Sequence, residues 1–138
     1  MAKKGRSHGL DTSVVLRLIT GEPETLAARA LLFIEEAIDA RDSIIVSDIV
    51  ICEAYFALNT HYDVPKREAI ATLIDMLSEG YISTTDGSPI LKVMRTCLKS
   101  SQKPGFVDRL IHAQYEADGT DMVSFEKSAG RLANTRIL

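Results

Sequence analysis

The segment Gly9-Leu10-Asp11-Thr12-Ser13-Val14-Val15-Leu16-Arg17-Leu18 marks a change of secondary structure near the start of the chain. A short apolar stretch ends in a carboxylate, two hydroxyl residues follow, and an apolar-periodic run begins. This order is typical of a buried strand that gives way to a helix, with Thr12 or Ser13 as the expected helix cap. The pattern therefore places Asp11 at a strand-to-helix junction.

Strands and helices are predicted to alternate along the rest of the chain. After the first strand, which ends at Leu10, strands are expected at 43–46, 81–84, 122–125 and 136–138. Helices are expected at 12–20, 24–41, 47–60, 65–80, 89–102 and 107–117, with a short one at 126–133. In the third helix, Ile49, Cys52, Phe56 and Ala57 are expected on the apolar side. This alternation predicts an α/β domain with a mainly parallel sheet and helices on both of its faces.

Length and composition are those of one ordinary globular domain. The chain has 138 residues, 46% hydrophobic and 25% charged, which is enough to bury a core. We expect residues 1–8, which are basic and polar, to be a flexible arm or a cloning remnant, and 9–138 to be a single domain. No apolar run approaches the roughly 20 residues that span a bilayer, and no signal peptide is visible, so no membrane association and a cytoplasmic location are expected.

Cysteine and histidine chemistry is not indicated. Cys52 and Cys97 are far apart in the sequence, show no metal-binding spacing, and have apolar neighbours, which favours buried thiols. The three histidines are scattered, and none accompanies a recognisable nucleophile. The sequence therefore argues against a cysteine or serine hydrolase.

Four acidic residues recur near the predicted ends of strands or starts of helices: Asp11, Glu53, Asp108 and Glu126. Ligands of open parallel sheets bind beyond the carboxyl ends of the strands, so these side chains are expected to converge. Converging carboxylates repel one another unless a cation or a proton lies between them. Hard cations prefer oxygen ligands, so we expect Mg²⁺, with Mn²⁺ as a substitute.

Such a site suits hydrolysis of phosphodiester bonds. In this hypothesis Asp11 and Asp108 bind the metal directly, and Glu53 binds it directly or through water. Glu126 orients the attacking water or completes a second metal position. Ser13 and Ser124 are expected to hydrogen-bond the carboxylates and orient them.

Helix capping is the alternative explanation for three of these acids. A carboxylate at a helix start is stabilising by about 0.3–1 kcal/mol, which accounts for Asp11, Asp108 or Glu126 taken singly. Glu53 does not fit this explanation, because it lies inside a predicted helix among apolar neighbours. The set of four therefore favours a metal site more than any single member does.

The chain resembles the PIN-domain ribonucleases, in particular the VapC-type toxins of bacterial toxin–antitoxin pairs. Four segments carry the resemblance, in the order and spacing of that family: Leu10 to Leu18, Val50-Ile51-Cys52-Glu53, Gly105-Phe106-Val107-Asp108-Arg109-Leu110-Ile111 and Val123-Ser124-Phe125-Glu126-Lys127. The resemblance covers nearly the whole chain. It implies a three-layer α/β/α sandwich, a Mg²⁺-dependent endoribonuclease acting on RNA, a homodimer, and a small VapB-like antitoxin that wraps the toxin and blocks its site.

The fourth motif departs from the family, which usually has a Thr-x-Asp pattern where this chain has Ser124-Phe125-Glu126. Glutamate keeps the charge but reaches one methylene further, which puts the metal geometry at this position in doubt. The departure keeps open a non-catalytic PIN-like module that binds a partner. A phosphoacceptor signalling domain is a further alternative, although the paired acids expected after its first strand are missing.

A basic stripe precedes Asp108. Its members are spaced three, four and four residues apart on one predicted helix face: Lys92, Arg95, Lys99 and Lys103. In a chain of net charge −3, such a stripe can guide RNA, although a solvated helix face explains it equally well. His112 is either a structural residue or a contact to substrate phosphate. The apolar surplus around Tyr55, Phe56, Leu58 and Tyr62 indicates either core packing or a surface for a subunit or the antitoxin.

Overall fold

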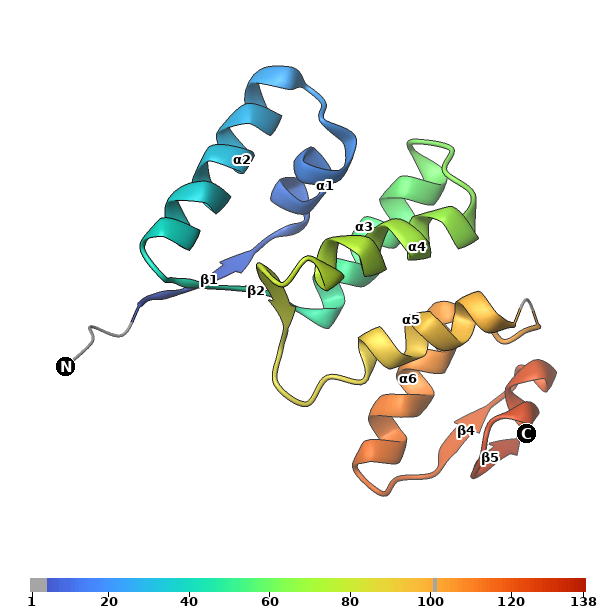
Figure 1. The fold of residues 1–138 in the computed structure, drawn as a ribbon. Coiled ribbons are helices and arrows are strands. Elements are labelled where there is room, and N and C mark those ends of the chain that lie inside the picture. The colour runs from blue at the N-terminus through green and yellow to red at the C-terminus, as the bar shows by residue number, and fades with distance from the viewer. Residues whose placement is uncertain (1–4, 101) are drawn as a thin grey trace. The chain divides into compact units, whose positions relative to one another are not determined.

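The computed structural model describes residues 5–100 and 102–138, and these divide into two compact units (Figure 1). The N-terminal unit extends to Asp86, and the C-terminal unit runs from Gly87 to Leu138. Strands and helices alternate in both units, and every pair of neighbouring strands is parallel. The predicted α/β class with a parallel sheet is thus confirmed.

The N-terminal unit is built on a three-stranded parallel sheet in the order β1-β2-β3. Its elements are β1 (Ser7–Leu10), α1 (Thr12–Thr20), α2 (Glu24–Asp39), β2 (Ser43–Val46), α3 (Asp48–Thr60), α4 (Lys66–Ser78) and β3 (Ile82–Thr84). Leu10 pairs with Val46, and Val46 pairs with Thr84, so the three strands end together. The segments that follow the strands therefore leave the sheet at one edge, and Asp11 is the first residue after β1.

A continuous apolar core holds this unit together. Val15 on α1, Val46 on β2 and Leu73 on α4 are completely buried. Burying a side chain of this size stabilises the fold by about 1.5–3 kcal/mol relative to leaving it exposed. The core thereby fixes the directions in which α1 and α3 leave the sheet.

Helix α3 buries a different face from the predicted one. Ala54, Tyr55 and Leu58 belong to the core, whereas Ile49 and Phe56 are 74% and 50% exposed. The prediction was wrong because α3 carries apolar residues on both sides, so periodicity alone could not choose between them. Packing against α1 and α4 makes the choice. It also assigns Tyr55 and Leu58 of the apolar surplus to the core and leaves Phe56 and Tyr62 exposed.

The first strand begins earlier than the sequence suggested. The expected arm of residues 1–8 is wrong for residues 7 and 8, which belong to β1, while residues 1–4 lie outside the described part of the chain. The Arg6 amide donates to Asp42 Oδ1 at 2.9 Å, and His8 Nε2 lies 2.8 Å from Asp42 Oδ2. Asp42 therefore holds the start of β1 through polar contacts, which the search for apolar residues in the sequence could not detect.

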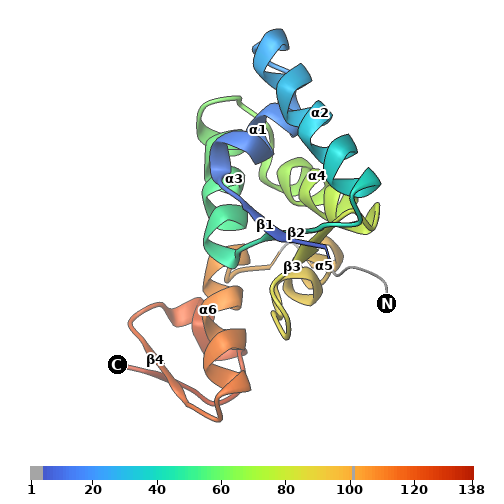
Figure 2. The same cartoon turned by 90° about the vertical axis from the view of Figure 1, so that its left-hand side faces the viewer.

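The C-terminal unit contains α5 (Ile90–Lys99), α6 (Phe106–Ala117), β4 (Met122–Ser124), the short 3₁₀ helix η1 (Lys127–Arg131) and β5 (Thr135–Ile137). Strands β4 and β5 form a two-stranded parallel sheet, and α6 packs against β4 (Figure 2). Ile90, Met94, Phe106 and Leu110 form the core between the two helices. In the described residues, no helix has the length and apolarity needed to cross a membrane.

Candidate functional site

Asp11 lies at the junction of β1 and α1 and is the N-cap residue of α1. Its Oδ1 accepts hydrogen bonds from the Ser13 amide at 2.9 Å, from the Val14 amide at 3.4 Å and from the Ser13 hydroxyl. The expected cap at Thr12 or Ser13 is thus wrong by one or two residues, because the helix already begins at Thr12. None of these three hydrogen bonds uses the other carboxylate oxygen, Oδ2.

These hydrogen bonds lower the pKa of Asp11 below its ordinary value of 3.8. The Ser13 hydroxyl contributes most, followed by the Val14 amide. A lowered pKa in the folded state stabilises that state at pH values above 3.8, and the effect is lost as the pH falls through the folded-state pKa. Asp11 is consequently an anion at neutral pH, as a metal ligand must be.

We expect Ser13→Ala to raise the pKa of Asp11 toward 3.8, because the substitution removes the strongest of these donors. The measurement is a pH titration of the Asp11 carboxyl carbon by NMR. Ser83→Ala, on an exposed part of β3, is the control and should leave that titration unchanged. An Asp11 pKa that is the same in Ser13→Ala as in the unaltered chain would show that the hydroxyl is not the cause.

Glu53 projects from α3 toward the segment that carries Asp11. The Thr12 hydroxyl donates to Glu53 Oε1 at 3.0 Å, and α1 packs against α3. Thr12 directly follows Asp11, so this bond ties Glu53 to the residue next to Asp11. The importance of Thr12 was not predicted. A hydroxyl next to Asp11 was visible in the sequence, but nothing there indicated a partner 41 residues away.

Asp108 and Glu126 form a second pair, in the C-terminal unit. Asp108 lies in the first turn of α6, and Glu126 is the residue before η1. Together with Ser124 they line one cavity of about 210 Å³ beside β4. Both carboxylates lie on the exposed surface.

Ser124 organises the turn between β4 and η1. Its hydroxyl accepts a hydrogen bond from the backbone amide of Glu126 at 2.9 Å. The sequence predicted a bond to a carboxylate, whereas the bond found here holds the backbone from which the Glu126 side chain projects. Ser13 does contact its predicted carboxylate, that of Asp11.

In each unit, two of the four predicted acids thus lie on neighbouring segments. Over the described residues, neither unit alone contains a group of three or more His, Cys, Asp or Glu side chains that could hold a metal ion.

The predicted basic stripe is exposed to solvent. Lys92, Arg95 and Lys99 lie on α5, and Lys103 lies in the loop that follows it. His112, on α6, donates from Nε2 to the carbonyl oxygen of Ala133 at 2.7 Å. Because a carbonyl only accepts, this bond requires the proton on Nε2 and holds the ring in place.

The two cysteines are only partly buried. Burial raises the pKa of both the Cys52 and the Cys97 thiols, so both are protonated at neutral pH. A protonated thiol is a poor nucleophile, which agrees with the absence of cysteine chemistry expected from the sequence.

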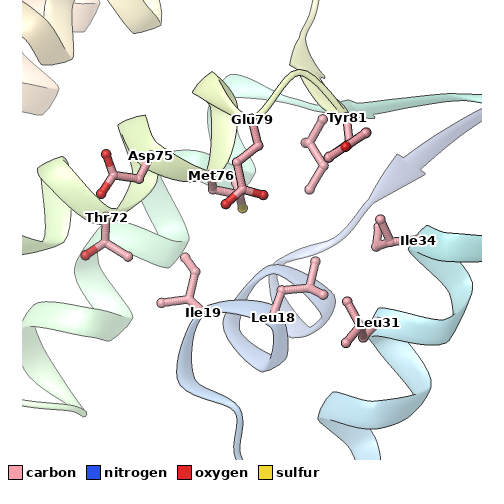
Figure 3. A pocket seen from close by; sticks show the side chains of 10 residues that line it. Leu18, Ile19, Leu31, Ile34, Thr72, Asp75, Met76, Glu79 and Tyr81 are labelled. Atoms are coloured by element: carbon pink, nitrogen blue, oxygen red, sulfur yellow. The ribbon is translucent and has the colours of Figure 1, made fainter. Parts of the chain in front are cut away.

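A separate groove of about 300 Å³ lies in the N-terminal unit, between α1, α2 and α4 (Figure 3). Leu18, Ile19 and Leu31 provide apolar walls, and Asp75 and Glu79 lie one helical turn apart at its α4 side. Neither carboxylate has an ion-pair partner within the described residues. No sequence pattern indicated this groove, because its lining comes from segments far apart in the chain.

Comparison with known proteins assigns the family. The PIN domain profile matches residues 10–134, which include all four acidic positions. One similar solved structure is VapBC2 from Rickettsia felis, crystallised with a DNA fragment from its promoter. Identity is 18% over 96% of this chain and 97% of that chain, with a TM-score of 0.38. No curated protein sequence matches the chain. The match to the PIN profile over nearly its whole length shows that the chain is a member of the PIN domain family.

Proposed function

We propose that this protein is a Mg²⁺-dependent endoribonuclease, with Mn²⁺ as a substitute metal, and the VapC-type toxin of a toxin–antitoxin pair in the cytoplasm. The observation that carries the proposal is the hydrogen bond from Thr12 to Glu53, which ties a second acidic residue to the neighbour of Asp11. Asp11 and Glu53 are two of the residues that the sequence analysis predicted as metal ligands. Cleavage of RNA by the purified protein with Mg²⁺, and its loss in EDTA, tests the proposal.

The acidic residues fit a hard divalent cation. Asp11 uses Oδ1 for its three hydrogen bonds, and Glu53 uses Oε1 to accept from Thr12. Within the described residues, Asp11 Oδ2 and Glu53 Oε2 are left for a metal or its water. A bound cation would polarise the phosphate and lower the pKa of an attacking water. These hydrogen bonds hold the carboxylate groups in place before substrate arrives.

We propose that Asp11 and Asp108 are direct ligands and that Glu53 completes the set directly or through water. Glu126 orients the attacking water or serves a second metal position. This assignment requires the two units to act as one PIN-like domain over residues 9–138. The extent of the family match, across both units, supports that requirement.

The basic stripe is proposed to guide RNA toward these acids. Log affinity falls with log salt, and replacing Lys99 and Lys103 together by Gln should make this slope less steep by about 2. Each removed phosphate contact reduces its steepness by about 1. The measurement is RNA binding over a salt series, with Lys66→Gln together with Arg67→Gln on α4 as the control for lost charge. An unchanged slope in the Lys99 and Lys103 variant would reject the role of the stripe.

The antitoxin is proposed to occupy the groove between α1, α2 and α4 with a segment that carries a bulky apolar residue and a Lys or Arg. The apolar walls would bury the apolar residue. Asp75 and Glu79, which have no ion-pair partner within the described part of the chain, would attract the Lys or Arg. Asp75→Asn with Glu79→Gln should slow association with the antitoxin about tenfold at low salt, since charges at the edge of an interface act mainly on association rates.

The antitoxin for this experiment is the small protein encoded by the reading frame adjacent to that of the toxin, and association is followed by surface plasmon resonance. Glu35→Gln with Glu36→Gln, which removes two exposed charges from α2, is the matched control. Equal association rates for the two double variants would exclude the groove.

A homodimer is proposed through the exposed apolar side of α3, where Ile49 and Phe56 lie two turns apart. Ile49→Glu should shift the mass measured by light scattering from two chains to one, and a dimer mass for that variant would exclude this face.

One observation favours a second function, a PIN-like module that binds a partner without cleaving RNA. Glu126 stands where the family usually has Asp, and its longer side chain changes the reach of the fourth carboxylate. Restoring the usual residue with Glu126→Asp separates the two. In an active enzyme the substitution changes an existing Mg²⁺-dependent rate, whereas in a binding module both forms leave RNA intact.

A further inference from the structure

A second cavity in the C-terminal unit, of about 400 Å³, lies between α5 and α6 and is distinct from the one beside Asp108. Lys92 on α5 and Arg109 on α6 supply positive charge to its lining. Val93, Ala113 and Leu132 supply apolar surface, and the His112 ring forms part of the wall. The combination of this apolar surface, called the apolar floor below, with cations distinguishes the cleft from an ordinary polar surface.

The charge of Arg109 is not neutralised by a carboxylate. Its Nε donates to the carbonyl oxygen of Pro104 at 2.7 Å, and its Nη2 donates to that of Gln102 at 3.2 Å. Both acceptors are neutral backbone groups, and over the described residues Arg109 has no ion pair. These two bonds hold the guanidinium in place and leave three of its five N–H donors for another group.

A second arginine adds to the charge at the same loop. Arg131 Nη1 donates to the carbonyl oxygen of Lys103 at 3.0 Å and to Gln102 Oε1 at 3.3 Å. Two guanidinium groups therefore bind three consecutive residues without a carboxylate between them. Glu116 supplies the single negative charge in the cleft lining, and it is exposed.

The two units differ in charge. The C-terminal unit carries eight Lys and Arg against five Asp and Glu, whereas residues 1–86 carry eight against fourteen. The net charge of −3 thus conceals a positive C-terminal unit. The C-terminal unit therefore attracts an anionic ligand more strongly than the N-terminal unit does.

We propose that the cleft between α5 and α6 binds one nucleotide of single-stranded RNA, with its phosphate at Lys92 and Arg109 and its base against the His112 ring and the apolar floor. Bases of single-stranded RNA stack on His rings and on arginine planes, so one nucleotide would use the ring, the apolar floor and the cations together. The inference rests on the proposed ribonuclease function, because it names a further contact of the same substrate.

The position of the cleft on α6 gives this nucleotide a defined relation to the acids of the C-terminal unit. Arg109 directly follows Asp108, and consecutive helical residues point about 100° apart. Asp108 therefore faces the cavity that it shares with Glu126, and Arg109 faces the cleft. An RNA strand that crosses α6 presents one phosphate to each side.

The experiment measures binding of a short fluorescein-labelled single-stranded RNA to the full chain in EDTA, by anisotropy over a salt series. Thr96 is exposed at the edge of the cleft, so Thr96→Glu adds a carboxylate there without disturbing the core. We expect Thr96→Glu to weaken binding about tenfold and Thr96→Gln, of equal size, to change it less than about twofold. Lys92→Gln should make the slope of log affinity against log salt less steep by about 1. Arg136→Gln, at an exposed position of β5, should leave this slope unchanged.

Two results would overturn the inference alone. In the first, Thr96→Glu binds RNA as Thr96→Gln does and Lys92→Gln leaves the slope unchanged, while the unaltered chain binds and cleaves RNA. In the second, Thr96→Glu keeps its RNA affinity but no longer binds the antitoxin, which would make the cleft a protein site. If the unaltered chain neither binds nor cleaves RNA, the ribonuclease function itself fails.

Discussion

Asp11→Asn is expected to abolish RNA cleavage, with a fall in kcat of at least about 100-fold. Loss of a residue that only supports a metal ligand lowers activity by up to about 100-fold, so loss of a ligand itself should cost at least as much. Asparagine keeps the shape of the side chain and remains a good N-cap residue, so α1 should be preserved. The substitution removes the negative charge and one strong metal-binding oxygen. Loss of activity in a chain that is still folded would therefore report on the charge of Asp11.

The assay is Mg²⁺-dependent cleavage of RNA under single-turnover conditions, with thermal unfolding of each variant measured in parallel. Asp39→Asn, which neutralises an exposed carboxylate at the end of α2, is the matched control and should cleave like the unaltered chain. Asp108→Asn should lose as much activity as Asp11→Asn. Cleavage at the unaltered rate by Asp11→Asn would contradict a role for this residue as a ligand.

Leu58→Ala should lower the free energy of unfolding by about 2–5 kcal/mol, because it leaves a cavity in the core of the N-terminal unit. Leu58 is 2% exposed and lies on the side of α3 that packs within this unit. Loss of a buried leucine removes both transfer free energy and packing contacts. The measurement is urea unfolding followed by circular dichroism, with the midpoint and slope fitted together.

Phe56→Ala provides the comparison, two residues earlier on the opposite side of α3. Phe56 is 50% exposed, so its removal should cost about 1 kcal/mol or less in the monomer. Equal losses of stability in the two variants would show that α3 does not bury the face described here. A larger loss for Phe56→Ala at high protein concentration would instead reveal a dimer contact.

The sequence predicted most of the strands and helices because each begins or ends at a local signal. Gly21 ends α1 in a left-handed conformation with φ of 69°, and Ser47 caps α3 by accepting from the Val50 amide. Strand β2 coincides with its predicted range of 43–46. Such signals act over a few residues, so no knowledge of tertiary contacts is needed to recognise them.

Features that depend on distant partners were missed. The bond from Thr12 to Glu53 joins residues of two helices, and the anchoring of Arg6 and His8 depends on Asp42. The buried side of α3 is chosen by α1 and α4. Local pattern identified the four acids as candidates. The bond of Glu53 to the residue after Asp11, and the cavity shared by Asp108 and Glu126, are visible only in the folded units.

The proposed cleavage of RNA requires Asp11, Glu53, Asp108 and Glu126 to share divalent metal. The most direct test is a crystal of the protein soaked in Mn²⁺, with anomalous diffraction measured near the manganese absorption edge. We predict an anomalous peak within bonding distance of both Asp11 and Asp108, with Glu53 in direct contact or one water away. No anomalous peak near these side chains at saturating Mn²⁺, or a peak near only one of Asp11 and Asp108, would contradict the shared site.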